Sequence, residues 1–319
     1  MKQKIVTALL ACLALQILQS AQAFPDRPLV VPSPAGGPPD IMARLLTDKM
    51  AAALGQPIIV ENRAGGGGGT VSARSVMAAE PDGYTLLMGS TSTLLIAPLI
   101  YRNAGYGAGT FAPVAGVSET VEVLAVHPSV PVRSVAELVV LAKSQPGALR
   151  YGSAGIGTLP HLEGELLKAR ADIEMMHVPY RGGGPALVGL LGGEVQVFFS
   201  AASQMLPYIR DGRLRGLAVT SERRSPLAPD LPTMVESGFD GFVTASINFI
   251  VAPPGTPISI REQLSEAVAA ALASAQVKDA FSRMGAKAEP ASPKELSSYV
   301  AQQQLRWAKI VETTRISID

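Results

Sequence analysis

Apolar residues in this sequence fall into two alternating patterns. Short runs such as Leu29–Val31 are typical of buried strands, and glycine- and proline-rich loops follow them. After the first such loop, apolar residues recur with the period of a helix between Ile41 and Leu54. A second stretch of the same design runs from Tyr151 to Leu162. Repeated strand–loop–helix units predict an α/β protein with parallel sheets, whose loops gather at the carboxyl ends of the strands.

The carboxyl-terminal part of the chain has a different pattern. A break at Ala252–Pro257 is followed by three helical stretches, Ser259–Ser274, Gln276–Met284 and Pro293–Thr313. Ser-x-x-Glu capping boxes mark the beginning of two of them. The chain of 319 residues is long enough to form two lobes rather than one core. We expect the helical tail to pack back onto the first lobe.

The first 23 residues have the composition of a secretory signal. Lys2 and Lys4 precede an apolar stretch from Ile5 to Leu18, and Ala21–Ala23 provides a small-residue cleavage site. Cleavage after Ala23 would leave 319 − 23 = 296 residues, with a net charge of (27 − 2) − 26 = −1. Such a balance argues against nucleic acid as a partner, because nucleic acid requires a basic face. We expect a soluble protein that is exported.

Cys12 is the only cysteine, and it lies within this signal. The mature chain is therefore expected to have no disulfide and no thiolate chemistry. Because Leu9–Cys12 has some similarity to a lipoprotein cleavage box, lipidation at Cys12 stays open as an alternative. Beyond the signal, no segment is long and apolar enough to cross a bilayer.

Two glycine loops give the strongest indication of a ligand. The first, Pro32–Pro39, leads into a helix that begins near Asp40, and the second, Gly152–Thr158, leads into a helix from Pro160. A helix that begins after such a loop presents unpaired N–H groups and a positive dipole end, and both attract anions. Since the first loop contains no Lys or Arg, we predict a carboxylate pocket formed by backbone groups. The alternative is that each loop is only a tight turn.

Three further sets of polar residues could contribute to such a pocket. Ser90–Thr93 places four hydroxyls at the end of a predicted strand, where they could bind a ligand or cap the next helix. Arg181 could pair with a far carboxylate of the ligand, or it could be a solvated loop cation. His161 could contact the ligand or hold the second loop. His127 and His177 are expected to be structural.

The sequence gives little support for catalysis or for a cofactor. Its three histidines lack metal-ligand spacing to one another or to acids on a helix face. The run Gly65–Gly69 is not followed by the Lys-Ser/Thr pair of a phosphate loop. The segment around Ser153 lacks the preceding glycine of a serine-hydrolase elbow, because Tyr151 stands there. We therefore expect no enzyme activity, no metal and no cofactor.

Seven motifs in order along the chain carry a family resemblance. They are VPSPAGGPPDIMARLL, LGQPIIVENRAGGGGG, AAEPDGYTLLMGSTST, LRYGSAGIGTLPHLEGELL, MHVPYRGGGPALVGLLGG, GRLRGLAVTSERRSPLAPDLPTMVESG and APPGTP. Each is weak by itself, but several together are specific, and they cover nearly all of the chain after the signal. On these motifs the chain resembles the Bug/TctC-type extracytoplasmic receptors, the soluble component of tripartite tricarboxylate transporters.

The resemblance implies an α/β, two-lobe, Venus-flytrap fold like that of periplasmic binding proteins, each lobe a mainly parallel sheet flanked by helices, and a location in the bacterial periplasm. It assigns residues 24–124 and 246–319 to a discontinuous first lobe and residues 125–245 to the second. Such receptors hold a small carboxylate between the lobes, and closure presents it to a membrane permease. The alternative is an orphan receptor that presents its ligand to a membrane sensor kinase. A monomer is expected.

The same motifs place the ligand loops at Ser33–Asp40 and Ser153–Thr158. Together with the hydroxyl, histidine and arginine positions, they give the candidate ligand-binding residues Ser33, Ala35, Gly36, Gly37, Asp40, Ser90, Thr91, Ser153, Ala154, Gly155, Gly157, Thr158, His161, Arg181 and Ser200.

The sequence departs from the family pattern at four places. Ser33 stands where an aromatic residue is common, Pro39 where Thr is common, and Ser200 where Asp is usual. The segment Ile247–Phe249 replaces an aromatic pair. The loss of an acid and of aromatic side chains suggests a larger ligand that lacks an amino group.

Overall fold

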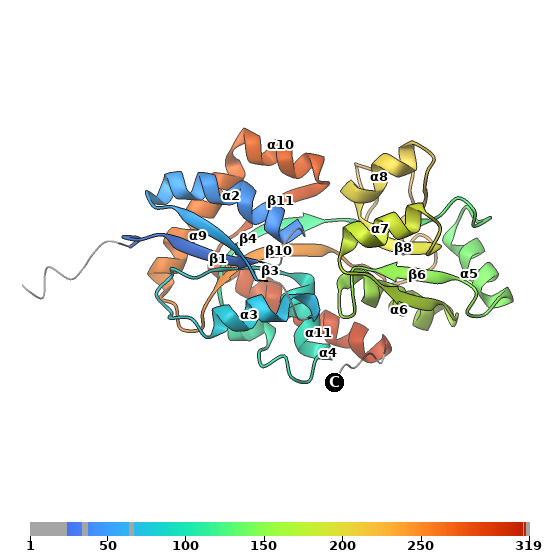
Figure 1. Ribbon diagram of the computed structural model, residues 1–319, viewed down its shortest axis with the longest axis horizontal. Coiled ribbons are helices and arrows are strands. Elements are labelled where there is room, and N and C mark those ends of the chain that lie inside the picture. The colour runs from blue at the N-terminus through green and yellow to red at the C-terminus, as the bar shows by residue number, and fades with distance from the viewer. Residues whose placement is uncertain (1–23, 34–37, 64–66, 315, 317–319) are drawn as a thin grey trace, which may run out of the picture.

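The computed structural model describes residues 24–33, 38–63, 67–314 and 316, which form two α/β lobes side by side (Figure 1). Each lobe has its own strands, with helices on both faces. The two-lobe α/β fold expected from the sequence is therefore confirmed. The predicted signal, including Cys12, and the loop residues Ala35, Gly36 and Gly37 lie outside the described residues.

The first lobe combines a parallel pair of strands with an antiparallel four-stranded sheet. β1 (Leu29–Ser33) and β2 (Ile58–Asn62) pair in parallel, and a bridge from Val30 to Thr85 connects them toward β3. The four-stranded sheet has the order β11-β4-β10-β3. The other elements of this lobe are α2 (Pro38–Leu54), α3 (Thr70–Met77), β3 (Leu87–Ser90), α4 (Ala97–Ile100), β4 (Ala112–Thr120), β10 (Ser246–Ala252), α9 (Ile258–Ala273), α10 (Ala275–Arg283), β11 (Ala286–Ala291), α11 (Pro293–Thr314) and the short helical turns Gly67–Gly69, Thr91–Ile96 and Ala108–Thr110.

The second lobe contains one five-stranded sheet with the order β7-β6-β8-β5-β9. Along the chain its elements are β5 (Glu122–Val126), α5 (Val135–Ser144), β6 (Arg150–Ser153), α6 (Leu159–Ala171), β7 (Met176–Pro179), α7 (Gly183–Leu191), β8 (Val197–Ala201), α8 (Ala202–Arg210) and β9 (Arg215–Val219). Helices α7 and α8 cover one face of this sheet, and α5 and α6 cover the other (Figure 1).

The sheets are mixed rather than mainly parallel, which corrects one detail of the sequence prediction. In the second lobe β6 is parallel to β7 and β8, but β5 is antiparallel to β8 and β9. In the first lobe β10 is antiparallel to both of its neighbours. β5 and β10 follow the passages of the chain between the lobes. Each of these two strands therefore begins at the edge of its sheet that faces the other lobe. Its direction is opposite to that of the strands in the repeated units.

The chain passes between the lobes in extended form. β4 ends at Thr120 and β5 begins at Glu122, so that only Val121 separates a strand of one sheet from a strand of the other. The return passage enters the first lobe where β10 begins, at Ser246. The two passages are close together, because Thr220 after β9 donates its N–H to the carbonyl of Glu122 and its hydroxyl to the carbonyl of Thr244.

The last helix, α11, packs against both lobes. It contacts α6 of the second lobe, and it contacts β4 and the helical turn Thr91–Ile96 of the first. Trp307 of this helix is 2% exposed and belongs to an apolar cluster that includes Phe249 of β10 and Leu162 of α6. The helical tail thus covers the first lobe, as expected, and also joins it to the second.

Replacement of Trp307 by alanine is expected to lower the free energy of unfolding by about 3–5 kcal/mol, because it leaves a cavity in this shared core. Urea unfolding followed by circular dichroism measures the change. Leu305→Ala, on the same helix but 71% exposed, is the matched control and should cost less than about 0.5 kcal/mol. Equal losses in the two variants would contradict the packing described for α11.

Candidate ligand-binding site

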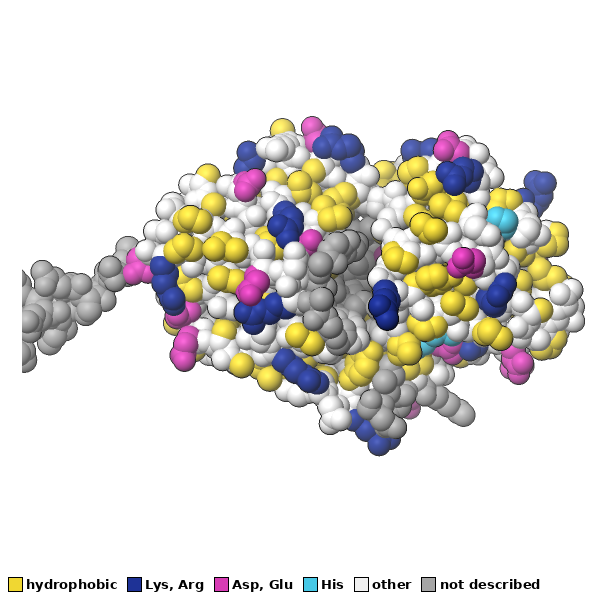
Figure 2. All heavy atoms as spheres, viewed as in Figure 1, with side chains coloured by type: hydrophobic (Ala, Val, Ile, Leu, Met, Phe, Trp, Pro, Cys, Tyr) yellow, Lys and Arg dark blue, Asp and Glu magenta, His cyan; other side chains and the backbone are white. Residues whose placement is uncertain are grey.

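A cavity of about 170 Å³ lies between the two lobes, beside the two passages of the chain. Its first-lobe lining consists of Pro39, Ser90, Ser92, Thr120 and Ser246. The second lobe contributes residues near the ends of its strands and the beginnings of its helices: Glu122, Ala154, Thr158, Leu159, Pro160, Gly183, Gly184, Phe198, Ser200, Ala201 and Gln204. On the face shown in Figure 2, charged side chains of both signs are scattered over both lobes.

Three helices begin at this cavity. Pro39 is in the first turn of α2, Leu159 and Pro160 open α6, and Gly183 and Gly184 open α7. The dipole of each helix is positive at this end, so the three beginnings favour an anion. Free N–H groups are expected at α7, where Gly183 and Gly184 line the cavity. α2 begins with two prolines, which have no N–H, and at the beginning of α6 the N–H of Leu159 is donated to the hydroxyl of Ser92. No Lys, Arg or His is among the described lining residues. An anion here would be held by backbone and hydroxyl groups.

The second glycine loop is held in shape by its own side chains. The Ser153 hydroxyl lies 2.7 Å from Nε2 of His177 and accepts the N–H of Gly155 at 3.1 Å. The Thr158 hydroxyl donates to the carbonyl of Gly155 at 2.7 Å, and Gly157 donates its N–H to Nδ1 of His161 at 3.2 Å. Ser153 and His161 thus support the loop, whereas Ala154 and Thr158 line the cavity.

A stack of rings lies beneath this loop. The ring of His177 stacks between Tyr151, at 4.8 Å, and His161, at 4.2 Å. Burial lowers the pKa of His161, and burial together with the neighbouring His161 lowers the pKa of His177 to about 4. Both rings are therefore neutral at pH 7. Nδ1 of His161 accepts a hydrogen bond from Gly157, so its proton lies on Nε2.

The glycines of this loop allow the two lobes to approach closely. A Cβ at Gly157, where φ is 77°, would lie 2.8 Å from Ile100 and Tyr101 of the first lobe. The Tyr101 hydroxyl donates to the carbonyl of Ile156 at 3.0 Å, and the N–H of Leu159 donates to the hydroxyl of Ser92 at 3.1 Å. A side chain of the first lobe therefore accepts a hydrogen bond from the beginning of α6.

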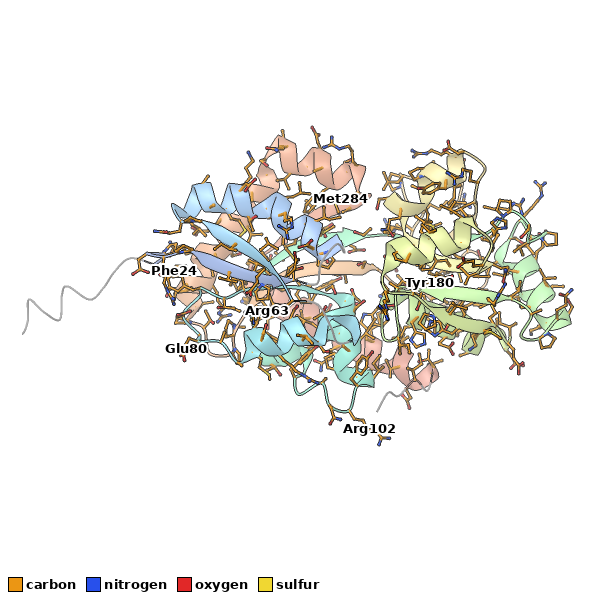
Figure 3. All side chains as sticks on the ribbon, viewed as in Figure 1. Phe24, Arg63, Glu80, Arg102, Tyr180 and Met284 are labelled. Carbon is orange, nitrogen blue, oxygen red and sulfur yellow. The ribbon has the colours of Figure 1, made fainter. Side chains whose placement is uncertain are left out.

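Gly155 has a different constraint. Its φ is 130°, and a Cβ there would lie 3.3 Å from the carbonyl oxygen of Tyr180. Tyr180, labelled in Figure 3, donates its own N–H to the carbonyl of Ser153, which ties the end of β7 to the loop after β6.

The predicted residues of the first lobe have different roles. Ser90 lines the cavity, and its hydroxyl also accepts the N–H of Thr93, so it caps the helical turn that follows. Thr91 is buried away from the cavity lining and fastens the return passage: it donates to the carbonyl of Ala245 and accepts the N–H of Ile247. Ser33 is fully buried at the end of β1.

Asp40 belongs to a polar contact within the first lobe. Its Oδ1 accepts a hydrogen bond from the Asn62 side chain at 2.8 Å and lies 3.2 Å from the Arg44 guanidinium. The carboxylate is 6% exposed and is not among the residues that line the cavity. Its position in the first turn of α2 connects that helix to the end of β2.

Two predicted residues of the second lobe behave differently. Ser200 lines the cavity and donates to Oε1 of Gln204 at 2.7 Å. Arg181 is exposed in the segment between β7 and α7, and it does not line the cavity. Gly183 and Gly184, two and three residues further on, do.

The sequence prediction missed several lining residues, including Thr120, Glu122, Gln204 and Ser246, and it included Ser92 only as a member of the hydroxyl run Ser90–Thr93. Glu122 had a signal that could have found it, because it is an acid within the apolar run Val121–Val126. The others lie at element ends whose proximity depends on how the two lobes meet.

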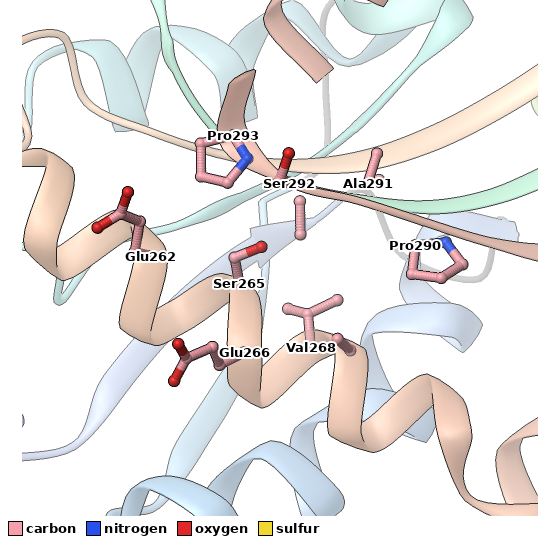
Figure 4. Close-up of a pocket in the computed structure, with 11 residues that line it drawn as sticks. Glu262, Ser265, Glu266, Val268, Pro290, Ala291, Ser292 and Pro293 are labelled. Carbon is pink, nitrogen blue, oxygen red and sulfur yellow. The ribbon is translucent and has the colours of Figure 1, made fainter. Parts of the chain in front are cut away.

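A larger hollow of about 410 Å³ lies on the first lobe alone (Figure 4). Glu262, Ser265 and Glu266 of α9 line one side, and Pro290–Pro293 lines the other. Its charged side chains among the described residues are two acids, which suits an anion poorly. The cavity between the lobes is the better candidate for a carboxylate.

The model of the tripartite tricarboxylate transporter family receptor matches residues 42–316 of this chain. The chain belongs to that family. BugT of Bordetella pertussis is 36% identical to it over 92% of this chain and 91% of BugT. A Rhodopseudomonas palustris protein solved with adipate is 34% identical, with a TM-score of 0.85, over 92% of this chain and 99% of that protein.

MatC of Rhodopseudomonas palustris, solved with bound malate, is similar to this receptor with 33% identity and a TM-score of 0.83. The alignment covers 90% of this chain and all of MatC. The two-lobe fold of this receptor is thus that of solved periplasmic binding proteins. Among its described residues, no helix has the length and apolar character to span a membrane, and no group of His, Cys, Asp and Glu could hold a metal ion.

The depressed pKa of His177 predicts that the folded receptor loses stability in acid. The unfolded chain takes up a proton near pH 6.5 and the folded one only near pH 4, so the stability is present above pH 6.5 and falls as the pH falls toward 4. Thermal unfolding between pH 7 and 4 measures this loss, which should be smaller in His177→Gln. His127→Gln, outside the ring stack, should keep the wild-type profile. Identical profiles in all three proteins would contradict the prediction.

Proposed function

We propose that this receptor captures a small carboxylate in the cavity between its lobes and delivers it to a tripartite tricarboxylate-type permease. The observation that carries the proposal is the convergence of three helix beginnings on a cavity whose described lining contains no basic side chain. A receptor that must release its ligand again is well served by neutral donors, because they bind an anion without a fixed salt bridge. Adipate and malate in the two solved relatives belong to the same ligand class.

The family and the sequence support the proposed location and partner. The basic, apolar and small-residue order of Met1–Ala23 supports export to the periplasm, with cleavage after Ala23. We propose a monomer whose lobes divide close to the expected boundaries, with the passages near Val121 and Thr244 as the hinge. An orphan receptor that presents its carboxylate to a membrane sensor kinase is the alternative, and it would use the same cavity. The proposed role is binding, without catalysis.

Thermal shifts of the protein from Phe24 onward test the ligand class. A ligand that binds only the folded state stabilises it by RT ln(1 + [L]/Kd), which is about 2.7 kcal/mol at 100 times Kd. We expect a shift with one class among di- and tricarboxylates and aromatic acids, and none with neutral sugars. Amino acids in the panel test whether the ligand lacks an amino group, as Ser200 suggests. Stabilisation by sugars alone would refute the proposal.

Replacement of Gly155 by valine is expected to weaken carboxylate binding by on the order of tenfold or more, because it reshapes the loop whose Ala154 and Thr158 line the cavity. Calorimetric titration measures the Kd, and circular dichroism checks the fold. Gly238→Val is the control, since Gly238 also has a positive φ of 92° but has no atom within 4 Å of an added Cβ and lies outside the cavity. Wild-type affinity in Gly155→Val would remove the loop from the site.

A further inference from the structure

Glu122 is the only ionisable side chain among the described residues that line the interlobe cavity. It stands at the first position of β5 and is 4% exposed. Leu124 and Val126, which follow it at alternate positions, belong to the apolar cluster that contains Leu162 and Leu166 of α6. Side chains at alternate positions of a strand share a face, so Glu122 points to the α6 side of the sheet. It therefore lies where that face opens into the cavity.

The carboxyl group of Glu122 has no partner within the part of the chain that the structure describes. The backbone of Glu122 is satisfied, since its carbonyl accepts the N–H of Thr220 at 3.0 Å, but no described group donates to or accepts from the side chain. A buried polar side chain without a partner is costly unless something else satisfies it. The cavity is the place from which such a partner can come.

A second buried acid stands behind it. Glu163 of α6 is 0% exposed, its Oε1 accepts the Thr244 hydroxyl at 2.5 Å, and its Oε2 has no partner. Burial raises the pKa of Glu122 to about 8, and burial together with the adjacent Glu122 holds the pKa of Glu163 well above its ordinary range. Two buried carboxyls that lie side by side cannot both ionise cheaply.

The other elements packed around Glu122 do not offset its charge. β8 presents Ser200 and Ala201, and the segments after β9 and before β10 present Thr220 and Thr244, all of them neutral. Glu163 on α6 is the one titratable group described as interacting with it. No cation faces the pair among these residues. Glu122 therefore carries its proton at neutral pH.

Resting on the proposed carboxylate-binding function, we propose that Glu122 contacts the ligand and, in its protonated form, donates a hydrogen bond to an anionic oxygen of the bound carboxylate. The beginnings of α2, α6 and α7 supply the positive end of the site, and a neutral carboxyl beside them adds a donor without adding negative charge. An O–H donor to a carboxylate is among the stronger hydrogen bonds available to a neutral side chain. The acid in the cavity thus selects for an anion because it is protonated.

The same geometry disfavours a ligand that places an ammonium group against Glu122. Such a ligand would have to bring a cation close to three positive helix ends and would have to remove the proton from Glu122. It would also leave Glu163 buried behind the new charge pair. If protonated Glu122 donates to the ligand, the affinity falls as the pH rises, whereas if ionised Glu122 binds an ammonium group, the affinity increases with pH. Measuring the Kd as a function of pH therefore distinguishes the two.

The experiment measures the Kd of adipate and of malate between pH 6.5 and 9.5 by calorimetry. Both probes are fully ionised over this range, so the ligand itself contributes no titration. In the wild type the affinity should be constant up to the pKa of Glu122, about 8, and then fall by about tenfold per pH unit. Glu122→Gln should bind within about threefold of the wild type at pH 7, because its amide still donates, and its Kd should stay constant to pH 9.5.

Two further variants and one measurement without ligand complete the test. Glu122→Leu, which has no donor, should bind at least about tenfold more weakly at pH 7. Glu163→Gln, outside the cavity lining, should retain the loss of affinity above pH 8. Infrared spectra of the ligand-free wild type at pH 7 should show protonated-carboxyl absorption that is reduced in Glu122→Gln and also reduced in Glu163→Gln, because the pKa of both acids is raised.

The outcomes distinguish this inference from the proposed function. If the probes bind but Glu122→Gln keeps the wild-type pH profile, Glu122 is not the donor and the inference is wrong, while the receptor function stands. An affinity that rises with pH in the wild type alone would show instead that ionised Glu122 receives a cationic group. If neither the probes nor any other acid of the panel binds the wild type, the proposed function fails and this inference fails with it.

Discussion

Helix beginnings from both lobes meet at one cavity, and the carboxylate binding proposed there depends on their staying together. The first turns of α6 and α7 come there because β6 and β7 are parallel and end at the same edge of their sheet. The beginning of α2 comes from the other lobe, so its position depends on how the lobes meet. The hydrogen bonds of Tyr101 to Ile156 and of Leu159 to Ser92 fix that meeting at the second glycine loop. The positions of these positive helix ends thus depend on tertiary contacts far more than the position of a basic side chain would.

Much of the fold could be predicted from the sequence, because its strands and helices carry clear periodic patterns. The glycine loop at Gly152–Thr158 and the helix after it stand where the pattern placed them. The directions of β5 and β10 could not be read in this way. The apolar pattern of a strand does not show whether the strand runs parallel or antiparallel to its neighbours. For β5 and β10 this direction depends on the two passages of the chain between the lobes.

The site was only partly predictable for a similar reason. Ser90, Ala154, Thr158 and Ser200 line the cavity. Ser90 was predicted from its place after a strand, Ala154 and Thr158 from the second glycine loop, and Ser200 from the comparison with the family pattern. Thr91 had the same signal as Ser90, yet its hydroxyl binds the backbone of the return passage. A run of hydroxyls does not show which of its side chains points toward a ligand. The sequence pattern can locate the edge of the sheet where the loops gather, but the role of each side chain there depends on its contacts with the opposite lobe.

Helix α11 gives this receptor a built-in optical probe. Trp307 is the only tryptophan of the chain, and it is buried in a helix that touches α6 on one side of the seam and β4 on the other. Indole emission responds to the polarity and to the mobility of its surroundings. Because α11 packs against both lobes, movement of one lobe relative to the other changes the contacts around Trp307 unless the helix moves with both. The emission spectrum of the unlabelled protein therefore reports on the junction between the lobes, without an attached dye and without a competing signal from a second indole.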